Sequence, residues 1–339
     1  MTPHPLEALG WTAHFTDNLT PEEVALPAVR LTALHRGRVE TIGAEGAGEL
    51  LCPPNMPVSL MAVGDWVLAD GPRVGRILPR ATLLQRRAAG TGTETQLIAA
   101  NVDTMFITTS CNADFNAARL ERYLVLAHSA GIEPVILLTK ADQADPAPYL
   151  ATARALSADV TVLALNAKAP ETAALLVAWV GPGHTAVLLG SSGVGKSTIA
   201  NSLGASQATG GIREEDGKGR HTTTARNLLP LTSGGWLIDT PGVRELQLTD
   251  VAEGIEILFS DLIDLAAMCR FRDCKHDQEP GCAVQAAIKA GKIDPGRLPR
   301  WRKLVAEEKT NSEAMATSKT RALGKNTKKS AQKWQTRKK

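Results

Sequence analysis

The clearest chemical pattern in this chain is a glycine-rich segment. Residues 190–198 read GSSGVGKST and follow the apolar stretch TAVLL. This fits G-x-x-x-x-G-K-[ST], in which backbone amides surround phosphates at the start of a helix. The lysine is expected to reach the β- and γ-phosphates, and the next hydroxyl to bind Mg²⁺. The predicted phosphate-binding residues are Gly190, Ser191, Ser192, Gly193, Val194, Gly195, Lys196, Ser197 and Thr198.

Two polar segments downstream are expected to complete the phosphate site. The strand-like stretch GGWLIDTPG contains Asp239 and Gly242. An acid at the end of a strand beside the phosphate loop can hold the Mg²⁺ shell, and the glycine amide can contact the γ-phosphate. Between the two segments lies GKGRHTTT, a Gly-flanked loop whose Thr223 is the predicted second Mg²⁺ ligand.

The residue that positions the attacking water is not obvious. Many GTPases place a Gln directly after D-x-x-G, where this chain has Val243. A valine side chain cannot hydrogen-bond water, and phosphoryl transfer depends on positioning. His221 is the predicted replacement because it lies in the loop expected to close over the γ-phosphate. The alternative is a loop histidine that contacts RNA or nothing. The predicted catalytic residues are His221, Lys196 and Thr223.

A base-binding site is expected upstream of the phosphate loop. The stretch EPVILLTKAD ends in Asp142, whose carboxylate can accept from both N1–H and the 2-amino group of guanine. Adenine offers neither donor, so it would leave a buried carboxylate unpaired. The Lys140 stem can lie along the base, and a backbone amide of NAK (166–168) can reach guanine O6. The predicted base-site residues are Thr139, Lys140, Ala141, Asp142, Asn166, Ala167 and Lys168.

A third group of residues has the types and spacing of metal ligands. Cys269, Cys274, His276 and Cys282 supply three thiolates and one imidazole within 14 residues. Four filled positions are typical of a closed structural zinc site rather than a catalytic one. The five cysteines of this long chain do not suggest a disulfide framework.

The elements around these motifs predict several domains. Short runs between about residues 30 and 90 predict an all-β barrel or sandwich of roughly five strands. Alternating apolar strands and helices from about 96 to 248 predict a mostly parallel sheet covered on both faces. The base-site motifs precede the phosphate loop, so the usual GTPase order is cyclically shifted. A parallel sheet tolerates this because strand neighbours define the site.

Charge is distributed unevenly along the 339 residues. The net charge is +3, but residues 301–339 hold 12 Lys/Arg and three acids. This tail suggests a polyanionic partner such as nucleic acid, or else a solvated disordered segment. The predicted barrel contains eight Arg and no Lys, and we expect these arginines to contact RNA phosphates. No secretory signal or membrane-spanning stretch is recognisable.

Together, the motifs resemble the circularly permuted GTPases of the RsgA (YjeQ) family. The similarity covers most of residues 9–300 and rests on LGW, TKAD, GSSGVGKST, GRHTTT, DTPGVREL and CRFRDCKH–EPGC in this order. It implies an OB-fold barrel, a permuted G domain and a C-terminal zinc domain. Thr139 stands where many GTPases have Asn, and Asn166 where the base-contacting loop often has Ser.

The predicted domains are an N-terminal extension (1–29), an OB-fold (30–92), a circularly permuted α/β G domain (96–250), a mostly helical zinc-binding domain (253–300) and a largely disordered basic tail (301–339).

The resemblance implies a cytoplasmic GTPase that acts in late maturation of the small ribosomal subunit. We expect GTP and GDP, one zinc ion, Mg²⁺ with GTP, and the subunit's rRNA as ligands or partners. We expect no membrane contact and a monomer. One alternative is a P-loop ATPase or kinase, which TKAD argues against. Another is an RNA-binding assembly factor whose nucleotide site is regulatory and hydrolyses GTP slowly.

Overall fold

The N-terminal strands alternate buried and exposed residues, and they close into a barrel. This computed structural model describes residues 4–87, 95–205, 226–240 and 250–314. The chain divides into two units. One comprises Met1–Gln85 and Gln96–Leu246, and the other comprises Arg86–Thr95 and Gln247–Lys339.

Five strands form the barrel: β1 (Ala28–His35), β2 (Arg38–Gly43), β3 (Gly46–Leu51), β4 (Trp66–Asp70) and β5 (Arg73–Ile77). Strand β1 pairs with β2 and β4, β2 with β3, β3 with β5, and β5 with β4, so the sheet closes on itself. A short 3₁₀ helix, Val58–Leu60, lies between β3 and β4. The barrel core consists of Leu31, Val39, Leu50, Met61, Val67, Ala69 and Val74. The predicted five-stranded barrel is confirmed.

The N-terminal extension packs against the barrel. It contains the 3₁₀ helices Glu7–Leu9 and Glu23–Ala25, and the short helix α1 (Ala13–Thr16). Trp11 meets the buried Trp66 ring edge-on at 4.9 Å between centroids. Aromatic pairs of this kind add stability beyond the area they bury. Trp66, the one aromatic of residues 30–90, is therefore a core residue and not an RNA-stacking residue.

The second part of this unit is the predicted α/β sheet. Strands β8, β9, β10, β11 and β13 are parallel to one another, and β12 runs antiparallel to β13. The spatial order is β10 (Thr161–Ala164), β9 (Glu133–Thr139), β8 (Thr104–Ser110), β11 (Thr185–Leu189), β13 (Trp236–Asp239) and β12 (Asn227–Pro230). A separate two-stranded sheet contains β6 (Leu83–Arg87) and β7 (Thr95–Ala100).

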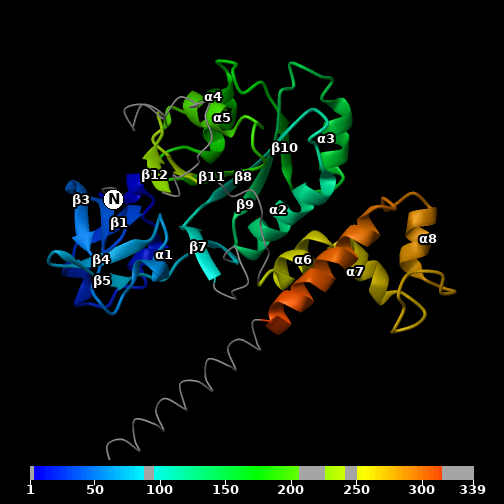
Figure 1. Cartoon of the computed structure of the whole chain (residues 1–339), viewed down its shortest axis with the longest axis horizontal. Coiled ribbons are helices and arrows are strands. Elements are labelled where there is room, and N and C mark those ends of the chain that lie inside the picture. The colour runs from blue at the N-terminus through cyan, green and yellow to red at the C-terminus, as the bar shows by residue number, and fades with distance from the viewer. Residues whose placement is uncertain (1–3, 88–94, 206–225, 241–249, 315–339) are drawn as a thin grey trace, which may run out of the picture. The chain divides into compact units, whose positions relative to one another are not determined.

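Helices cover both faces of the α/β sheet (Figure 1). Helices α2 (Ala117–Ser129) and α3 (Ala147–Arg154) pack on β8, β9 and β10. Helices α4 (Thr172–Leu176), followed by the 3₁₀ turn Val177–Trp179, and α5 (Lys196–Ser202) pack together.

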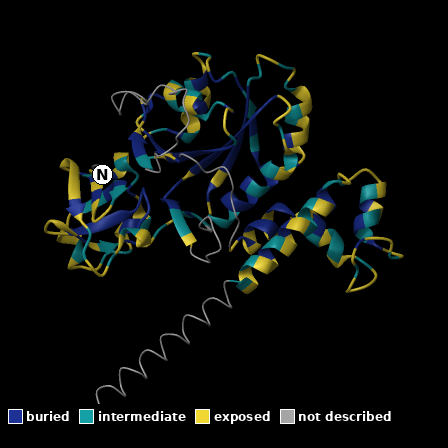
Figure 2. Cartoon of the chain, viewed as in Figure 1, coloured by how far each residue is buried: buried dark blue, intermediate teal, exposed yellow. Residues whose placement is uncertain are grey.

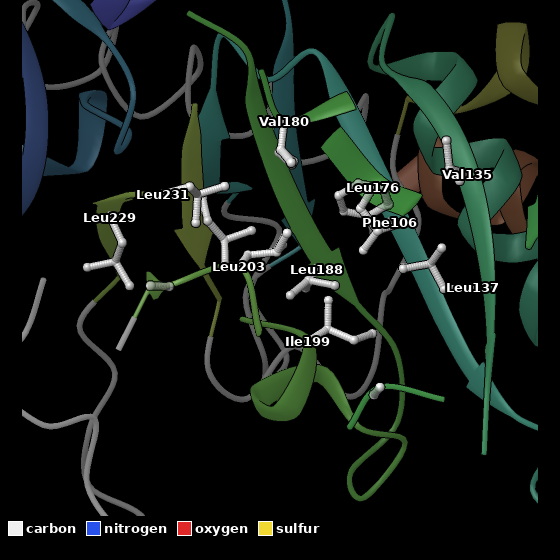
Figure 3. Close-up of a cluster of buried hydrophobic side chains, with 14 of the residues drawn as sticks. Phe106, Val135, Leu137, Leu176, Val180, Leu188, Ile199, Leu203, Leu229 and Leu231 are labelled. Atoms are coloured by element: carbon white, nitrogen blue, oxygen red, sulfur yellow. The ribbon is translucent and has the colours of Figure 1, made fainter. Parts of the chain in front are cut away.

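A large cluster of buried side chains joins the strands of this sheet to α4 and α5. Phe106, Leu137 and Leu188 come from three neighbouring strands, and Leu176 and Ile199 come from the two helices (Figure 3). The strands themselves are almost entirely buried, as Figure 2 shows. Such continuous apolar strands are typical of parallel sheets covered on both faces.

The barrel and the α/β sheet are connected by one strand pairing. Ala33 of β1 pairs with Asn227 of β12, so eleven strands form one continuous sheet. Beside this pairing, Arg30 is 1% exposed and its guanidinium donates to three carbonyls. The acceptors are Leu9 at 2.6 Å, Asn101 at 3.0 Å and Gly64 at 3.3 Å. Burial lowers the Arg30 pKa to about 10, opposed by Asp103 and Asp65, so the group remains cationic at neutral pH.

We expect Arg30→Met to destabilise the protein by about 3 kcal/mol, because three carbonyls would lose their donor. Denaturant unfolding of the full chain measures this loss. Arg73→Met is the matched control, since Arg73 is exposed on β5. A loss below about 1 kcal/mol for Arg30→Met would contradict the assigned role.

The second unit is helical. It contains α6 (Ala252–Leu258), α7 (Ser260–Ala267), α8 (Ala283–Lys289) and a helix at 297–314. The Arg297 guanidinium lies 4.8 Å from the Phe259 ring centroid and donates to the Leu258 carbonyl at 2.7 Å.

The helix at 297–314 crosses the predicted boundary at residue 301, so the expectation of a largely disordered tail is wrong for 301–314. Leu298 and Leu304 are buried, which gives this segment an apolar face despite its many charges. Residues 315–339 lie outside the described part of the chain. Among the described residues, no helix has the length and apolar character needed to span a membrane.

Candidate functional site

The predicted phosphate loop connects β11 to α5. Gly190 follows β11 directly and has a φ of 146°. A Cβ on this residue would lie 2.1 Å from the Thr108 carbonyl oxygen, so only glycine fits beside β8. The loop therefore lies at the carboxyl edge of the central strands, where ligands of open α/β sheets bind.

Lys196 lies at the first turn of α5. Its ammonium donates to the carbonyls of Gly190 at 2.8 Å and Ser191 at 2.6 Å. The charge is therefore held over the loop itself. Ser197, the next residue, is exposed on the same turn and offers a hydroxyl oxygen.

Asp239 ends β13, the strand next to β11. Its carboxyl group lies among protein atoms although the residue as a whole is exposed, and this loss of hydration raises its pKa. Lys196 and the backbone amide of Thr240 lower the pKa in opposition. The hydroxyl of Ser197 and this carboxylate are hard oxygen donors, which is the chemistry that Mg²⁺ prefers.

The predicted base-site residues lie at the ends of β9 and β10. Lys140 has a φ of 58°, so the chain turns sharply after Thr139. Asp142 is exposed two residues later. In the neighbouring loop, the Asn166 side chain accepts from the Lys168 amide at 3.0 Å and thereby shapes the turn. This side chain is used within the loop, which is consistent with the predicted backbone contact to the base; that contact itself stays a prediction.

The base-site loops touch the phosphate loop. Thr139 is fully buried, and its hydroxyl lies 2.7 Å from the Val194 carbonyl and 3.1 Å from the Thr109 carbonyl. A Cβ built on Gly195 would lie 3.7 Å from Thr139 Cγ2 and 3.8 Å from Ala167 Cβ. Segments far apart in the sequence are therefore brought to one place.

We expect Thr139→Val to weaken GDP binding about tenfold, because the Val194 carbonyl would lose its donor while the side chain keeps its shape. Equilibrium binding of GDP measures the change. Thr139→Ser keeps the hydroxyl and is the control. If the two variants bind GDP equally well, the hydroxyl does not support the phosphate loop.

Three of the predicted residues lie outside the described residues. These are His221, Thr223 and Gly242. Their roles in water positioning, Mg²⁺ binding and γ-phosphate contact stay predictions.

The predicted zinc ligands converge in the loop between α7 and α8. The four ligand atoms of Cys269, Cys274, His276 and Cys282 all lie within 4.8 Å of one another. Cys269 Sγ and Cys282 Sγ are 3.9 Å apart, and each lies 3.5 Å from His276 Nδ1. Tetrahedral zinc with ordinary bond lengths needs separations of about 3.8 Å and about 3.6 Å, so these residues fit the ion.

The protonation of this cluster is coupled to metal binding. Desolvation and then the neighbouring Cys282 and Cys269 thiols raise the pKa of Cys274 to about 11, although its backbone contact with His276 opposes this. Without a bound cation Cys274 is therefore a neutral thiol at neutral pH, and binding of a metal ion to its thiolate would release that proton.

Two supporting residues of this loop were missed in the sequence. Gln285 donates to the His276 carbonyl at 2.6 Å, and the Glu279 carboxylate accepts from the Lys275 and Asp277 amides, both at 2.8 Å. Outer residues of this kind orient metal ligands. In the sequence, the only indication of their role was that they lie within or just after the segment that contains the four metal ligands.

Comparisons with known proteins agree with this arrangement. The family model described as RsgA GTPase matches residues 77–249. A small ribosomal subunit biogenesis GTPase RsgA of Mesorhizobium japonicum is 52% identical over 315 residues, which is 91% of each chain. A small ribosomal subunit biogenesis GTPase RsgA 2 of Vibrio vulnificus is 46% identical over 94% of this chain and 92% of its own.

Two solved structures have the same fold. Thermotoga maritima YjeQ aligns with a TM-score of 0.60 and 24% identity over 83% of this chain and 98% of its own. YloQ, described as a circularly permuted GTPase, aligns with a TM-score of 0.57 and 24% identity over 86% and 98%. The predicted barrel, permuted α/β domain and helical C-terminal region are confirmed.

Proposed function

Because this chain belongs to the RsgA GTPase family, we propose that it hydrolyses GTP to GDP and phosphate in the maturation of the small ribosomal subunit. The observation that carries the proposal is the contact of the base-site strand end with the phosphate loop, through Thr139 and Val194. We further propose that the small subunit stimulates the reaction, and that the protein acts as a cytoplasmic monomer.

The base is held at the ends of β9 and β10. The Asp142 carboxylate accepts the N1 and 2-amino protons of guanine, and the Lys140 stem lies along the ring. A backbone amide of residues 166–168 donates to O6. The sharp turn at Lys140 supports this because it directs the chain from β9 across the sheet edge.

The phosphates are held by the loop of residues 190–198. Its backbone amides surround the phosphate oxygens, and Lys196 neutralises the β- and γ-phosphates. Ser197 and Asp239 hold Mg²⁺ and its water shell, with Thr223 as a further ligand in our proposal. Bound Mg²⁺ neutralises the charge that develops on the phosphate oxygens.

Four of the eight arginines in the predicted barrel segment are buried or ion-paired within the chain, which leaves fewer of them for RNA than their number suggests. Arg30 is buried, Arg80 binds Asp65 at 2.6 Å, and Arg38 binds Glu49 at 3.0 Å. Arg76 is paired with Glu23. Arg80 and Arg38 are paired within the barrel, whereas Arg76 and Arg30 connect it to the N-terminal extension through Glu23 and Leu9.

Two exposed barrel arginines are candidates for RNA phosphate contacts. Among the described residues, the exposed Arg36 and Arg73 form no ion pair. Arg36 lies in the turn between β1 and β2, and Arg73 begins β5. We propose that these two side chains provide the barrel's contribution to rRNA binding.

We expect Cys274→Ser to lose its zinc and to bind small subunits at least about tenfold more weakly, with GTP affinity within about twofold of wild type. The reason is that the metal organises a unit separate from the nucleotide site. Metal content, subunit pelleting and GTP titration give the three readouts.

Cys52→Ser is the matched control, because Cys52 is a barrel cysteine outside the metal cluster. An equal loss of GTP affinity and subunit binding in Cys274→Ser would overturn this division of roles.

A further inference from the structure

The metal-binding loop exposes large apolar side chains. Phe271 is 42% exposed and lies between the ligands Cys269 and Cys274. Met268, directly before the first ligand, is 64% exposed. Many residues in this loop between α7 and α8 are exposed (Figure 2). An exposed apolar ring in a loop that is fixed by a Cys3His cluster suggests a contact with another molecule.

Arg270 is held in place next to this ring. Its amide donates to the Gly281 carbonyl at 3.1 Å. A Cβ on Gly281, which has a φ of 78°, would lie 3.0 Å from Arg270 Cβ and 3.3 Å from its Cδ. The aliphatic stem therefore packs on the glycine backbone. The guanidinium carbon lies 5.5 Å from the Phe271 ring centroid.

Among the described residues of this loop, the charged side chains that form no ion pair are mostly positive. Asp277 is paired with Arg302 at 2.8 Å, and the Glu279 carboxylate is used by two backbone amides. Arg272 and Lys275 are exposed and add to the charge of Arg270, and these three cations outnumber the exposed carboxylate of Asp273.

We propose that Phe271 and Arg270 form a stacking surface for an unpaired base of the small-subunit RNA. The inference rests on the proposed function, and it names the part of the partner that this loop binds. Unstacked RNA bases stack on aromatic rings and on guanidinium planes, and the flanking positive charge suits a polyanion. An apolar pocket of a protein would instead have to bury a guanidinium beside the ring, which is costly.

The test compares Phe271→Leu with Phe271→Tyr in the full chain. Leucine keeps an apolar side chain but cannot stack, whereas tyrosine keeps the ring. We expect Phe271→Leu to bind purified small subunits roughly 5- to 100-fold more weakly, and Phe271→Tyr to bind within about twofold of wild type. Val305→Ala is the matched control, because Val305 is 43% exposed on the helix at 297–314.

Chemical probing of the subunit RNA gives a second readout. Wild type and Phe271→Tyr should change the base reactivity of the same one or few unpaired nucleotides, and Phe271→Leu should not. Zinc content and the melting temperature should be equal in all variants, since the side chain is exposed. Arg270→Lys keeps the charge without the planar group and should also weaken the footprint.

Wild-type affinity and footprint in Phe271→Leu would overturn the inference. Retained binding in Phe271→Leu with lost binding in Phe271→Ala would indicate an apolar protein pocket, which also overturns it. If wild type itself fails to bind small subunits, the proposed function fails instead, so the two failures are distinguishable.

Discussion

The Asp142→Asn variant should lose GTP binding by about 10³-fold and should gain binding of xanthosine triphosphate. The carboxylate of Asp142 is expected to accept two protons from guanine. An asparagine would accept at Oδ1, but its amino group would face the 2-amino group of guanine, and two donors would meet. Xanthine carries an oxygen at this position, so the same amide can donate to it.

Competitive binding with GTP, xanthosine triphosphate and ATP measures this exchange. Asp145→Asn is the matched control, because an amide oxygen can still accept from the Ala147 amide as the Asp145 carboxylate does at 3.0 Å. Unchanged GTP affinity in Asp142→Asn would remove this residue from the base site. ATP competing as well as GTP would contradict a guanine site altogether.

The His221→Ala variant should keep GTP affinity and subunit binding but lose about 10²-fold in subunit-stimulated kcat. The water-orienting position after D-x-x-G is Val243, which cannot hydrogen-bond water. His221 precedes Thr223, the proposed Mg²⁺ ligand, by two residues. We propose that its imidazole holds the attacking water in the subunit-bound state.

Single-turnover rates with saturating small subunits give the measurement, and GDP affinity reports the integrity of the site. His184→Ala is the control, because His184 is an exposed histidine in the turn before β11. A stimulated kcat within about twofold of wild type would exclude His221 as the positioning residue.

The predictable parts of this protein are those that chemistry constrains locally. A phosphate loop needs glycines, a lysine and a hydroxyl at fixed offsets, and a zinc site needs ligands of fixed type. For this reason Lys196, Ser197 and the Cys274 cluster were recognisable from spacing alone. The parallel sheet was predictable because its strands are almost wholly apolar.

The less predictable parts depend on partners that are distant in the sequence. Nothing local distinguishes Arg30, which is buried beside the pairing of β1 with β12, from Arg73, which is exposed on the barrel. The contact of Thr139 with Val194 joins residues 55 positions apart, so it depends on the order of the strands in the α/β sheet.

The helix at 297–314 was missed for a related reason. Its apolar face is narrow, and the surrounding charges lower the average hydrophobicity of the segment.

The most direct test of the account is the rate of GTP hydrolysis by the full chain, measured alone, with purified small ribosomal subunits and with large subunits. In our proposal the small subunit completes the catalytic site, so we expect a rise of roughly one to two orders of magnitude with small subunits only. Equal rates under all three conditions, with GTP and subunits both bound, would contradict a subunit-stimulated GTPase and favour a regulatory nucleotide site.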